Sequence, residues 1–351
     1  MILDPTHVPP VYTEATRCAD CYKCVRECPV KAVRVQGGVA RVTAEACVAC
    51  GHCVAVCPSQ AKRVRDDLPR VRALLAGPRP VVVSLAPSHP AAFPDLGAGR
   101  LIAGLRALGF AAVGETACGA QEVSGAVAGL LVSGPPQAWI SSACPAAVDY
   151  LKKYHPDLGS RVTDLLSPLL AHARMLRTAF GPEVAVVFIG PCIAKKREAE
   201  LFPDLVDACL TFADLRRAWA ESGCDPARLT PGGDDVFRPA PAAGGTLYPV
   251  EGGMLAGIKA GCGACDADLM SVSGLPDIAR ALRDLGREPL VRPLFVELLA
   301  CRGGCIGGPG LDGPGGTLAR RRAVIAQAGE DGRHPPPPPR LDLTTAWAAQ
   351  A

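Results

Sequence analysis

One cysteine spacing occurs twice near the start of the chain and limits what this part can fold into. Each copy reads Cys-x2-Cys-x2-Cys-x3-Cys-Pro, over residues 18–29 and again over residues 47–58. Three thiolates at this spacing can surround one 4Fe-4S cluster, and the fourth cysteine of such a run ligates the second cluster of a pair. The repeat therefore predicts one cluster on Cys18, Cys21, Cys24 and Cys57 and a second on Cys28, Cys47, Cys50 and Cys53. Zinc is the alternative metal for Cys-x2-Cys pairs, but two identical runs that each end in proline favour iron and sulfide.

Length and composition set further limits. The chain has 351 residues, of which 49% are hydrophobic, so one large or two modest domains can each bury a core. Its 17 cysteines cannot all pair as disulfides, and metal binding in a reducing compartment is the first hypothesis. A formal charge of +3, spread along the chain, gives no sign of nucleic-acid binding. Without a signal peptide or an apolar run long enough to span a membrane, the sequence predicts a cytoplasmic protein with no membrane partner.

The order of apolar runs predicts two domains and a tail. Residues 11–68 are expected to form a small α+β domain that resembles the bacterial-type 2(4Fe-4S) ferredoxins, with a hairpin around Gly37-Gly38. Residues 78–312 alternate strand-length apolar runs with helix-compatible stretches, which predicts an α/β domain with largely parallel sheets. Residues 313–351 are expected to form a proline-rich tail with an arginine-rich helical patch. The expected strands of the second domain lie at 81–87, 139–142, 184–189 and 294–299, and its clearest helices at 101–108 and 165–179.

Three cysteines of the second domain directly follow expected strands. They are Cys144, Cys192 and Cys301, and Cys305 follows the last of them in a Gly-Gly loop. Because ligands gather at the carboxyl ends of strands in parallel α/β sheets, these four thiols are expected to converge on one site. Four convergent thiolates can hold another 4Fe-4S cluster; the alternative is a set of unrelated buried thiols. Pro145 fits the first turn of a helix, whose positive end would then face an anionic cluster beside Cys144.

The sequence around these cysteines resembles the three cluster-binding motifs of the iron-only (FeFe) hydrogenases, in the order of that family. The motifs are Ser-Ser-Ala-Cys-Pro at 141–145, Pro-Cys-Ile-Ala-Lys-Lys-Arg-Glu at 191–198 and Glu-Leu-Leu-Ala-Cys-Arg-Gly-Gly-Cys at 297–305. With the ferredoxin repeat, the resemblance covers residues 11–312 and implies a hydrogenase-like fold for the second domain. It also implies an H-cluster: a cubane on Cys144, Cys192, Cys301 and Cys305, with Cys305 bridging to a diiron unit that carries carbonyl, cyanide and dithiolate ligands.

The same resemblance assigns a role to Lys195, which matches the family lysine that hydrogen-bonds a cyanide ligand. A buried cation beside an anionic cluster makes physical sense; the alternative is a solvated helix charge next to Lys196 and Arg197. Lys195 and Cys305 are therefore the expected catalytic residues, with H2 and protons as reactants. The sequence has no Walker loop and no Gly-x-Gly-x-x-Gly after a strand, so electrons are expected to come from a redox partner protein rather than from a nucleotide.

Three positions depart from the hydrogenase pattern. Ala143 stands where the family usually has a proton-relaying cysteine, and Gly190 and Leu299 stand where it has methionines. These differences resemble the branches regarded as sensory or uncharacterised, which implies slow interconversion of H2 with protons and electrons. Such a rate would suit an H2 sensor, which would need a signalling partner. The alternative is an iron-sulfur electron carrier or assembly scaffold that holds a third 4Fe-4S cluster and never receives the diiron unit.

The remaining cysteines have less specific contexts. Cys118, Cys262 and Cys265 either contribute to an extra metal site or are free or redox-active thiols, and the sequence favours the second interpretation. Cys209 has apolar neighbours and is expected in the core, whereas Cys224 lies in a turn and is expected to have no role.

Three polar residues near the predicted clusters also have two interpretations each. Glu115 and Glu122 either relay protons or lie on a solvated helix face, and the solvated face is favoured. His52 stands between two predicted ligands and either tunes a cluster by hydrogen bonding or is simply exposed, and exposure is favoured.

Overall fold

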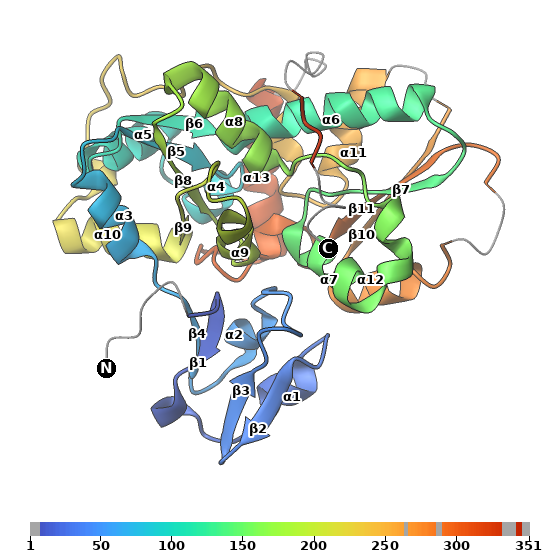
Figure 1. Cartoon of the computed structure of the whole chain (residues 1–351). Helices are drawn as coiled ribbons and strands as arrows, with labels where there is room; N and C mark the ends of the chain where they lie inside the picture. The colour runs from blue at the N-terminus through green and yellow to red at the C-terminus, as the bar shows by residue number, and fades with distance from the viewer. Residues whose placement is uncertain (1–7, 263–265, 286–289, 332–341, 346–351) are drawn as a thin grey trace.

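The computed structural model describes residues 8–262, 266–285, 290–331 and 342–345. A small amino-terminal domain lies against one side of a larger domain, close to helices α7 (Pro145–Tyr154) and α9 (Ala194–Leu201) (Figure 1). Among the described residues, no helix combines the length and the apolar character that crossing a membrane requires.

The small domain is built from two similar halves. Strands β1 and β4 pair antiparallel, and so do β2 and β3, which confirms the hairpin expected around Gly37-Gly38. Each cysteine run contains one short helix, and the residues that precede these helices, Tyr22 and Gly51, both have a left-handed conformation. The sequence repeat is therefore also a structural repeat. The elements are β1 (Val11–Thr13), α1 (Lys23–Glu27), β2 (Val33–Gln36), β3 (Val39–Val42), α2 (His52–Val56) and β4 (Lys62–Val64).

The larger domain contains two parallel sheets, with strand orders β6-β5-β8-β9 and β10-β11-β7. Strands β5, β8 and β11 are buried along their whole length, which is why they read as continuous apolar runs with little polar alternation. The strands are β5 (Val81–Leu85), β6 (Ala112–Glu115), β7 (Ala138–Ile140), β8 (Ala185–Gly190), β9 (Ala208–Thr211), β10 (Asp268–Ser273) and β11 (Leu294–Leu299).

Helices surround and connect the two sheets (Figure 1). The longest, α6, packs against α8 and α11, and α13 packs against the short helix α4. The helices are α3 (Leu68–Leu75), α4 (His89–Ala92), α5 (Ala98–Ala107), α6 (Thr116–Ser133), α8 (Pro168–Phe180), α10 (Phe212–Ser222), α11 (Gly253–Cys262), α12 (Leu275–Ala281) and α13 (Thr317–Asp331), besides α7 and α9. Single 3-10 turns occur at Ala15–Arg17, Pro156–Arg161, Pro226–Arg228, Gly244–Leu247 and Cys305–Gly307.

The two domains share an apolar core. Val33 and Val48 of the small domain pack in one group with Ile140 of β7, Leu151 of α7 and Ile193, which precedes α9. The small domain is thus packed onto the second sheet, because separating the two would expose these side chains to water.

The segments on either side of the expected second domain also pack on it. Leu68 and Val71 of α3, Val324 of α13 and Leu343 all belong to the core around the first sheet. Helix α3 and the described part of the tail therefore belong to the larger domain by packing. The run of five prolines lies outside the described residues.

Candidate metal centres

The eight cysteines of the small domain lie in two sets of four. Burial raises the pKa of Cys24, and so do the charges of the other three thiolates of its set. Burial and the charges of the other three thiolates of the second set raise the pKa of Cys53 to about 12. Each set therefore combines three cysteines of one copy with the fourth cysteine of the other. We name them the outer set, Cys18, Cys21, Cys24 and Cys57, and the inner set, Cys28, Cys47, Cys50 and Cys53.

Backbone amides point at several of these sulfurs. The N–H of Ala32 donates to Cys28 Sγ at 3.3 Å, and the N–H of Ala49 donates to Cys47 Sγ at 3.3 Å. At Cys57 burial alone would raise the pKa of the thiol, but nearby backbone amides and a serine hydroxyl donate to the sulfur and lower it. Donors of this kind stabilise the thiolate, which is the form that binds metal.

Four more cysteines meet in one cavity between the domains. Cys144 is the residue before α7 and follows β7, Cys192 follows β8, and Cys301 follows β11, so two come from the second sheet and one from the first. Cys305 begins a single helical turn. We name these four the domain set. They line a cavity of about 30 Å³, together with Cys50 of the inner set.

The chemistry of the domain set fits a multi-iron cluster. Burial and the charge of Cys144 raise the pKa of Cys192 to about 12, and burial with the other three thiolates of the set raises the pKa of Cys301. In the described ranges, no group of three or more His, Cys, Asp and Glu side chains is arranged to hold a metal ion. The four thiols that line the shared cavity are the number of ligands that a 4Fe-4S cluster takes.

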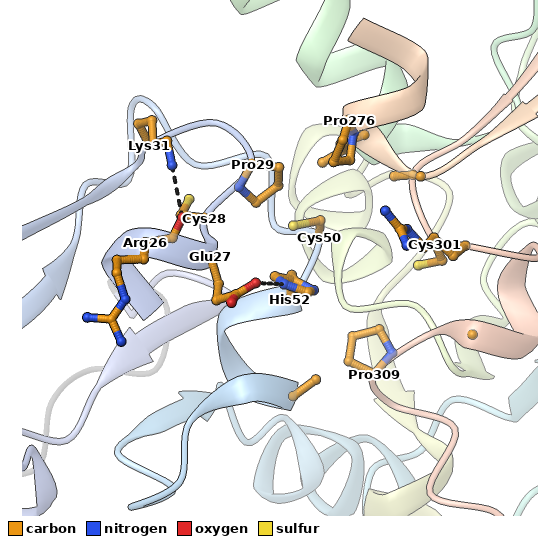
Figure 2. A pocket seen from close by; sticks show the side chains of 16 residues that line it. Arg26, Glu27, Cys28, Pro29, Lys31, Cys50, His52, Pro276, Cys301 and Pro309 are labelled. Carbon is orange, nitrogen blue, oxygen red and sulfur yellow. Dashed lines mark hydrogen bonds and ion pairs between the residues drawn. The ribbon is translucent and has the colours of Figure 1, made fainter. Parts of the chain in front are cut away.

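The inner set borders the domain set. The charge of Cys50 acts on Cys301, where it adds to the effect of burial in raising the pKa of that thiol. Figure 2 shows Cys28 and Cys50 on the small-domain side of an interdomain groove of about 520 Å³ and Cys301 on the other side. His52 lies in the same groove with its Nε2 atom 3.6 Å from Glu27 Oε2, and both side chains are about half exposed. The favoured interpretation of His52 as an exposed residue agrees with this position.

Lys195 is buried beside the domain set. Its Nζ atom donates to Ser167 Oγ at 2.9 Å and to Glu198 Oε2 at 2.5 Å. Its positive charge lowers the pKa of Cys192 and Cys305, although burial has the larger and opposite effect on both thiols. The alternative of a solvated helix charge is therefore wrong, since the side chain is buried against the core.

The three positions that depart from the hydrogenase pattern, Ala143, Gly190 and Leu299, each have a different packing environment. The N–H of Ala143 donates to Ser141 Oγ at 3.1 Å, and Leu299 lines the domain-set cavity. A Cβ atom at Gly190 would lie 2.5 Å from the Phe188 ring and 2.6 Å from Ala86 Cβ, so those two residues fill the space.

Sequence reasoning missed Met254, a buried residue of α11. Its Sδ atom accepts a hydrogen bond from Ser141 Oγ at 3.2 Å. A thioether therefore lies beside the first motif, supplied by a distant part of the chain. A lone methionine after two glycines carries no sequence signal of this position.

The carboxyl groups of Glu122 on α6 and of Glu115, the residue before α6, are buried, although a solvated position was expected for both. Glu115 and Glu122 are 2% and 3% exposed, so the solvated helix face is wrong for both. Glu115 Oε2 accepts from the N–H of Ala242 at 2.7 Å. The backbone therefore supplies a hydrogen-bond partner to the buried Glu115 carboxyl group.

The other described cysteines lie apart from the three sets. Burial raises the pKa of Cys118 to about 12, with a further effect of the charges of Glu115 and Glu122. Cys209 is buried as expected, and its thiol donates to the Lys195 carbonyl at 3.1 Å. The side chains of Cys262 and Cys265 lie outside the described residues, and Cys224 is partly buried.

Comparison with sequence families gives two matches. A family described as "Iron only hydrogenase large subunit, C-terminal domain" matches residues 79–309, and one described as "4Fe-4S dicluster domain" matches residues 10–58. Together they cover the second domain and both cysteine runs.

Two curated relatives align with most of this region. The chain is 29% identical over 265 residues to the periplasmic [Fe] hydrogenase large subunit of Nitratidesulfovibrio vulgaris, which is 60% of this chain and 62% of that protein. It is 24% identical over 294 residues to iron hydrogenase 1 of Clostridium pasteurianum, which is 68% of this chain and 51% of that protein. The chain thus spans between half and two thirds of the length of these relatives.

Solved structures share the fold. An apo variant of the [FeFe]-hydrogenase HydA1 from Chlamydomonas reinhardtii superposes with a TM-score of 0.59 at 21% identity, over 74% of this chain and 88% of that one. Another [FeFe]-hydrogenase structure gives a TM-score of 0.60 at 21% identity, over 77% and 90%. The expected fold, a ferredoxin-like domain followed by a hydrogenase-like α/β domain with parallel sheets, is confirmed.

Proposed function

We propose that this chain, which belongs to the iron-only hydrogenase family through the C-terminal domain of the large subunit, is an oxidoreductase that interconverts H2 with protons and electrons at a low rate. A low rate suits H2 sensing, in which a signalling partner would receive the output. The observation that carries the proposal is the cavity lined by the four thiols of the domain set, with the buried ammonium of Lys195 acting on two of them.

We assign one 4Fe-4S cluster to the outer set, one to the inner set and a cubane to the domain set, where Cys305 would bridge to a diiron unit. When bound, these groups supply electron storage and a centre at which H2 is formed or split. The chain's own part is to provide thiolates in a cavity lined mainly by apolar residues and backbone.

Lys195 is held in position to bind an anionic ligand of the diiron unit. An ammonium group has three N–H donors, and Ser167 and Glu198 accept two of them. The third donor remains for a cyanide ligand, to which a charge-assisted hydrogen bond would be strong because the site is buried.

The contact between the inner and domain sets supports electron exchange between the two domains, because Cys50 and Cys301 are close enough to interact electrostatically. At the other end, Cys21 of the outer set is exposed. We therefore propose that an external redox protein exchanges electrons at the outer set. The described cysteines form no disulfides, which suits the reducing cytoplasm that the sequence predicts; the compartment stays a prediction, since one relative is named as periplasmic.

The test is H2 evolution from a reduced viologen dye after expression with the hydrogenase maturation enzymes. We expect slow but measurable H2 evolution that falls to background in Cys305→Ser, while the iron bound by the outer and inner sets is unchanged. Equal rates in the wild-type protein and the variant, or no H2 from protein that carries the diiron unit, would contradict the proposal.

A non-catalytic electron carrier or assembly scaffold is the second candidate. It is favoured by Ala143, which has no exchangeable side-chain proton, and by the side chains that fill the space at Gly190. This candidate predicts three 4Fe-4S clusters and no diiron unit after maturation.

A further inference from the structure

Two cations of the larger domain contact the inner set at one backbone oxygen. Lys153 Nζ donates to the Cys47 carbonyl at 2.7 Å, and Arg197 Nη1 donates to the same oxygen at 3.2 Å. Next to it, Tyr154 OH donates to the Ala46 carbonyl at 2.7 Å. The loop that carries the first cysteine of the second run is thus held by three side chains from another domain, two of which are positively charged.

The helices that carry these cations begin at cysteines of the domain set. Helix α7 follows Cys144 and ends one residue after Lys153, and α9 starts shortly after Cys192 and includes Arg197. At 1.5 Å per residue, the helix between Cys144 and Lys153 spans about 13 Å. The two helices therefore connect the domain set with the inner set. Lys153, near the end of α7, and Arg197, in the middle of α9, place positive charge at the inner set.

The charge at Cys47 is sheltered from solvent. The Arg197 side chain is 31% exposed and also lies 3.2 Å from Asp149 Oδ2, whose side chain is 16% exposed. Burial raises the pKa of Cys47, and the charges of Lys153 and Arg197 act in the opposite sense on the same thiol. Partly buried charges are screened less than exposed ones, so their field reaches the metal site.

The outer set has a comparable contact from its own domain: Arg26 Nη1 donates to the Cys21 carbonyl at 3.3 Å, at an exposed site where solvent screens the charge. Lys62 lowers the pKa of Cys24 in the outer set and of Cys53 in the inner set, so its charge acts on both sets. Reduction adds negative charge to a cluster, and a fixed cation close by stabilises that charge.

We propose that Lys153 and Arg197 raise the reduction potential of the inner cluster above that of the outer cluster, so that an electron entering at the outer set settles next to Cys301. This inference rests on the proposed function, because it requires a cluster on each set. Lys153 and Arg197 are positioning residues here, since they act on the metal site through a backbone oxygen and through space.

The test is a redox titration of the cluster-loaded full chain followed by electron paramagnetic resonance. Lys153→Gln keeps a hydrogen-bond donor and removes the charge, whereas Lys153→Arg keeps both. In Lys153→Gln we expect the reduction potential of the inner cluster to fall by about 59 mV, which corresponds to a tenfold change in the equilibrium constant for its one-electron reduction. Lys153→Arg is expected to match the wild-type protein, and so is Lys152→Gln, which removes a neighbouring charge of the same helix.

Two further variants give the sign of the effect independently. Arg197→Gln is expected to lower the same potential, and Asp149→Asn is expected to raise it, because it removes the anion beside Arg197. Wild-type potentials in both Lys153→Gln and Arg197→Gln, with inner clusters present by iron and sulfide analysis, would overturn the inference and leave the proposed function intact. A wild-type chain that binds no cluster at the inner set would instead contradict the proposed function.

Discussion

Because residue 143 is alanine, its side chain cannot transfer a proton to a group bound at the domain set. A methyl group has no exchangeable hydrogen, and the only polar group of this residue near the motif is a backbone N–H bound to Ser141 Oγ. Ser141 in turn donates to Met254 Sδ, so its hydroxyl hydrogen is engaged as well. The side chain of Ala143 and the hydroxyl of Ser141 therefore provide no free proton donor beside Cys144.

Ala143→Cys is expected to raise H2 turnover by at least about tenfold, since a positioned acid or base contributes roughly 10²–10⁴ in rate. The measurement is H2 evolution by matured protein with equal diiron content. Ala143→Ser is the matched control, because a hydroxyl of similar size releases its proton far less readily than a thiol. Equal rates in all three proteins would mean that Ala143 does not limit turnover.

Two buried histidines give the stability of the folded chain a pH dependence. Burial lowers the pKa of His172 to about 3 and that of His89 to about 4, against about 6.5 in an unfolded chain. Below pH 6.5 the unfolded state binds protons that the folded state does not, so stability is present above this pH and is lost as the pH falls toward the folded values. Each histidine contributes about 1.4 kcal/mol per pH unit in that window.

The test compares His172→Asn with the wild-type chain. Asparagine can keep the hydrogen bond that links His172 Nδ1 and Ser84 Oγ at 2.8 Å but does not titrate. We expect the fall in thermal midpoint between about pH 7.5 and about pH 5.5 to be smaller in the variant, with His89 accounting for part of the remainder. An identical fall in both proteins would show that His172 is not a source of the pH dependence.

Helix α9 carries three successive basic residues whose side chains contact three different parts of the molecule. Lys195 faces the domain set, Lys196 is fully buried against Asp67 Oδ2 at 3.1 Å and the Cys209 carbonyl at 2.8 Å, and Arg197 contacts the small domain at Cys47. Successive residues on a helix point about 100° apart, which makes this division possible. One short helix thus links the domain set, the start of α3 and the loop of the small domain at Cys47.

Lys196→Met is expected to destabilise the fold by about 3 kcal/mol, because it leaves buried acceptors without their cation. The measurement is the thermal midpoint, which should fall by several degrees. Lys31→Met, an exposed lysine whose ammonium donates to a backbone carbonyl, is the control and should leave the midpoint nearly unchanged. A midpoint for Lys196→Met within one degree or so of the control would contradict this role of α9.

Whether an element could be predicted from the sequence depended on how it is buried. Strands β5, β8 and β11 are covered on both faces and were visible as apolar runs. Strand β10 carries Asp268 and two serines and is only partly buried, and β6 contains a glycine and a buried glutamate, so neither has the pattern of a buried strand. A helix was expected around Glu122, but its solvated face was predicted wrongly, because α6 is apolar on nearly all sides and buries Glu122.

At the scale of the whole molecule, the position of the small domain determines which cysteine sets are neighbours. Gly51 lies next to Cys50 at a point where the two domains are in close contact. It has φ +74°, and a Cβ atom there would come within 2.5 Å of Ile193 Cδ1 and of Pro309 Cγ. Only glycine meets both requirements, the left-handed conformation and the close approach.

Gly51→Ala is expected to loosen the contact between the domains. Gly38→Ala is a closely matched control, because Gly38 has φ +73° but a Cβ atom there would have no neighbouring atom within 4 Å. The control should cost about 1–2 kcal/mol for its conformation, and Gly51→Ala should cost roughly 1–3 kcal/mol more from overpacking. Hydrogen exchange should report the loss at α2 and around Ile193. Equal exchange in both variants would mean that the close contact is not needed to hold the domains together.

The sequence allowed us to predict which cysteines form each set, but not which sets lie next to one another. The x2 and x3 spacings place ligands within one loop, and strand ends indicate where Cys144, Cys192 and Cys301 converge. The proximity of Cys50 to Cys301 and the bonds of Lys153 and Arg197 to Cys47 depend on how two domains pack, and no local pattern in the sequence encodes such packing.

We propose that the domain set holds a cubane joined through Cys305 to a diiron unit. Infrared spectroscopy after coexpression with the maturation enzymes tests this proposal, because bound carbonyl and cyanide absorb where protein does not. We expect such bands in the wild-type chain, a shift of the cyanide bands in Lys195→Gln, and loss of all of them in Cys305→Ser. A wild-type protein with its three cubanes fully loaded and no carbonyl or cyanide band would contradict the claim.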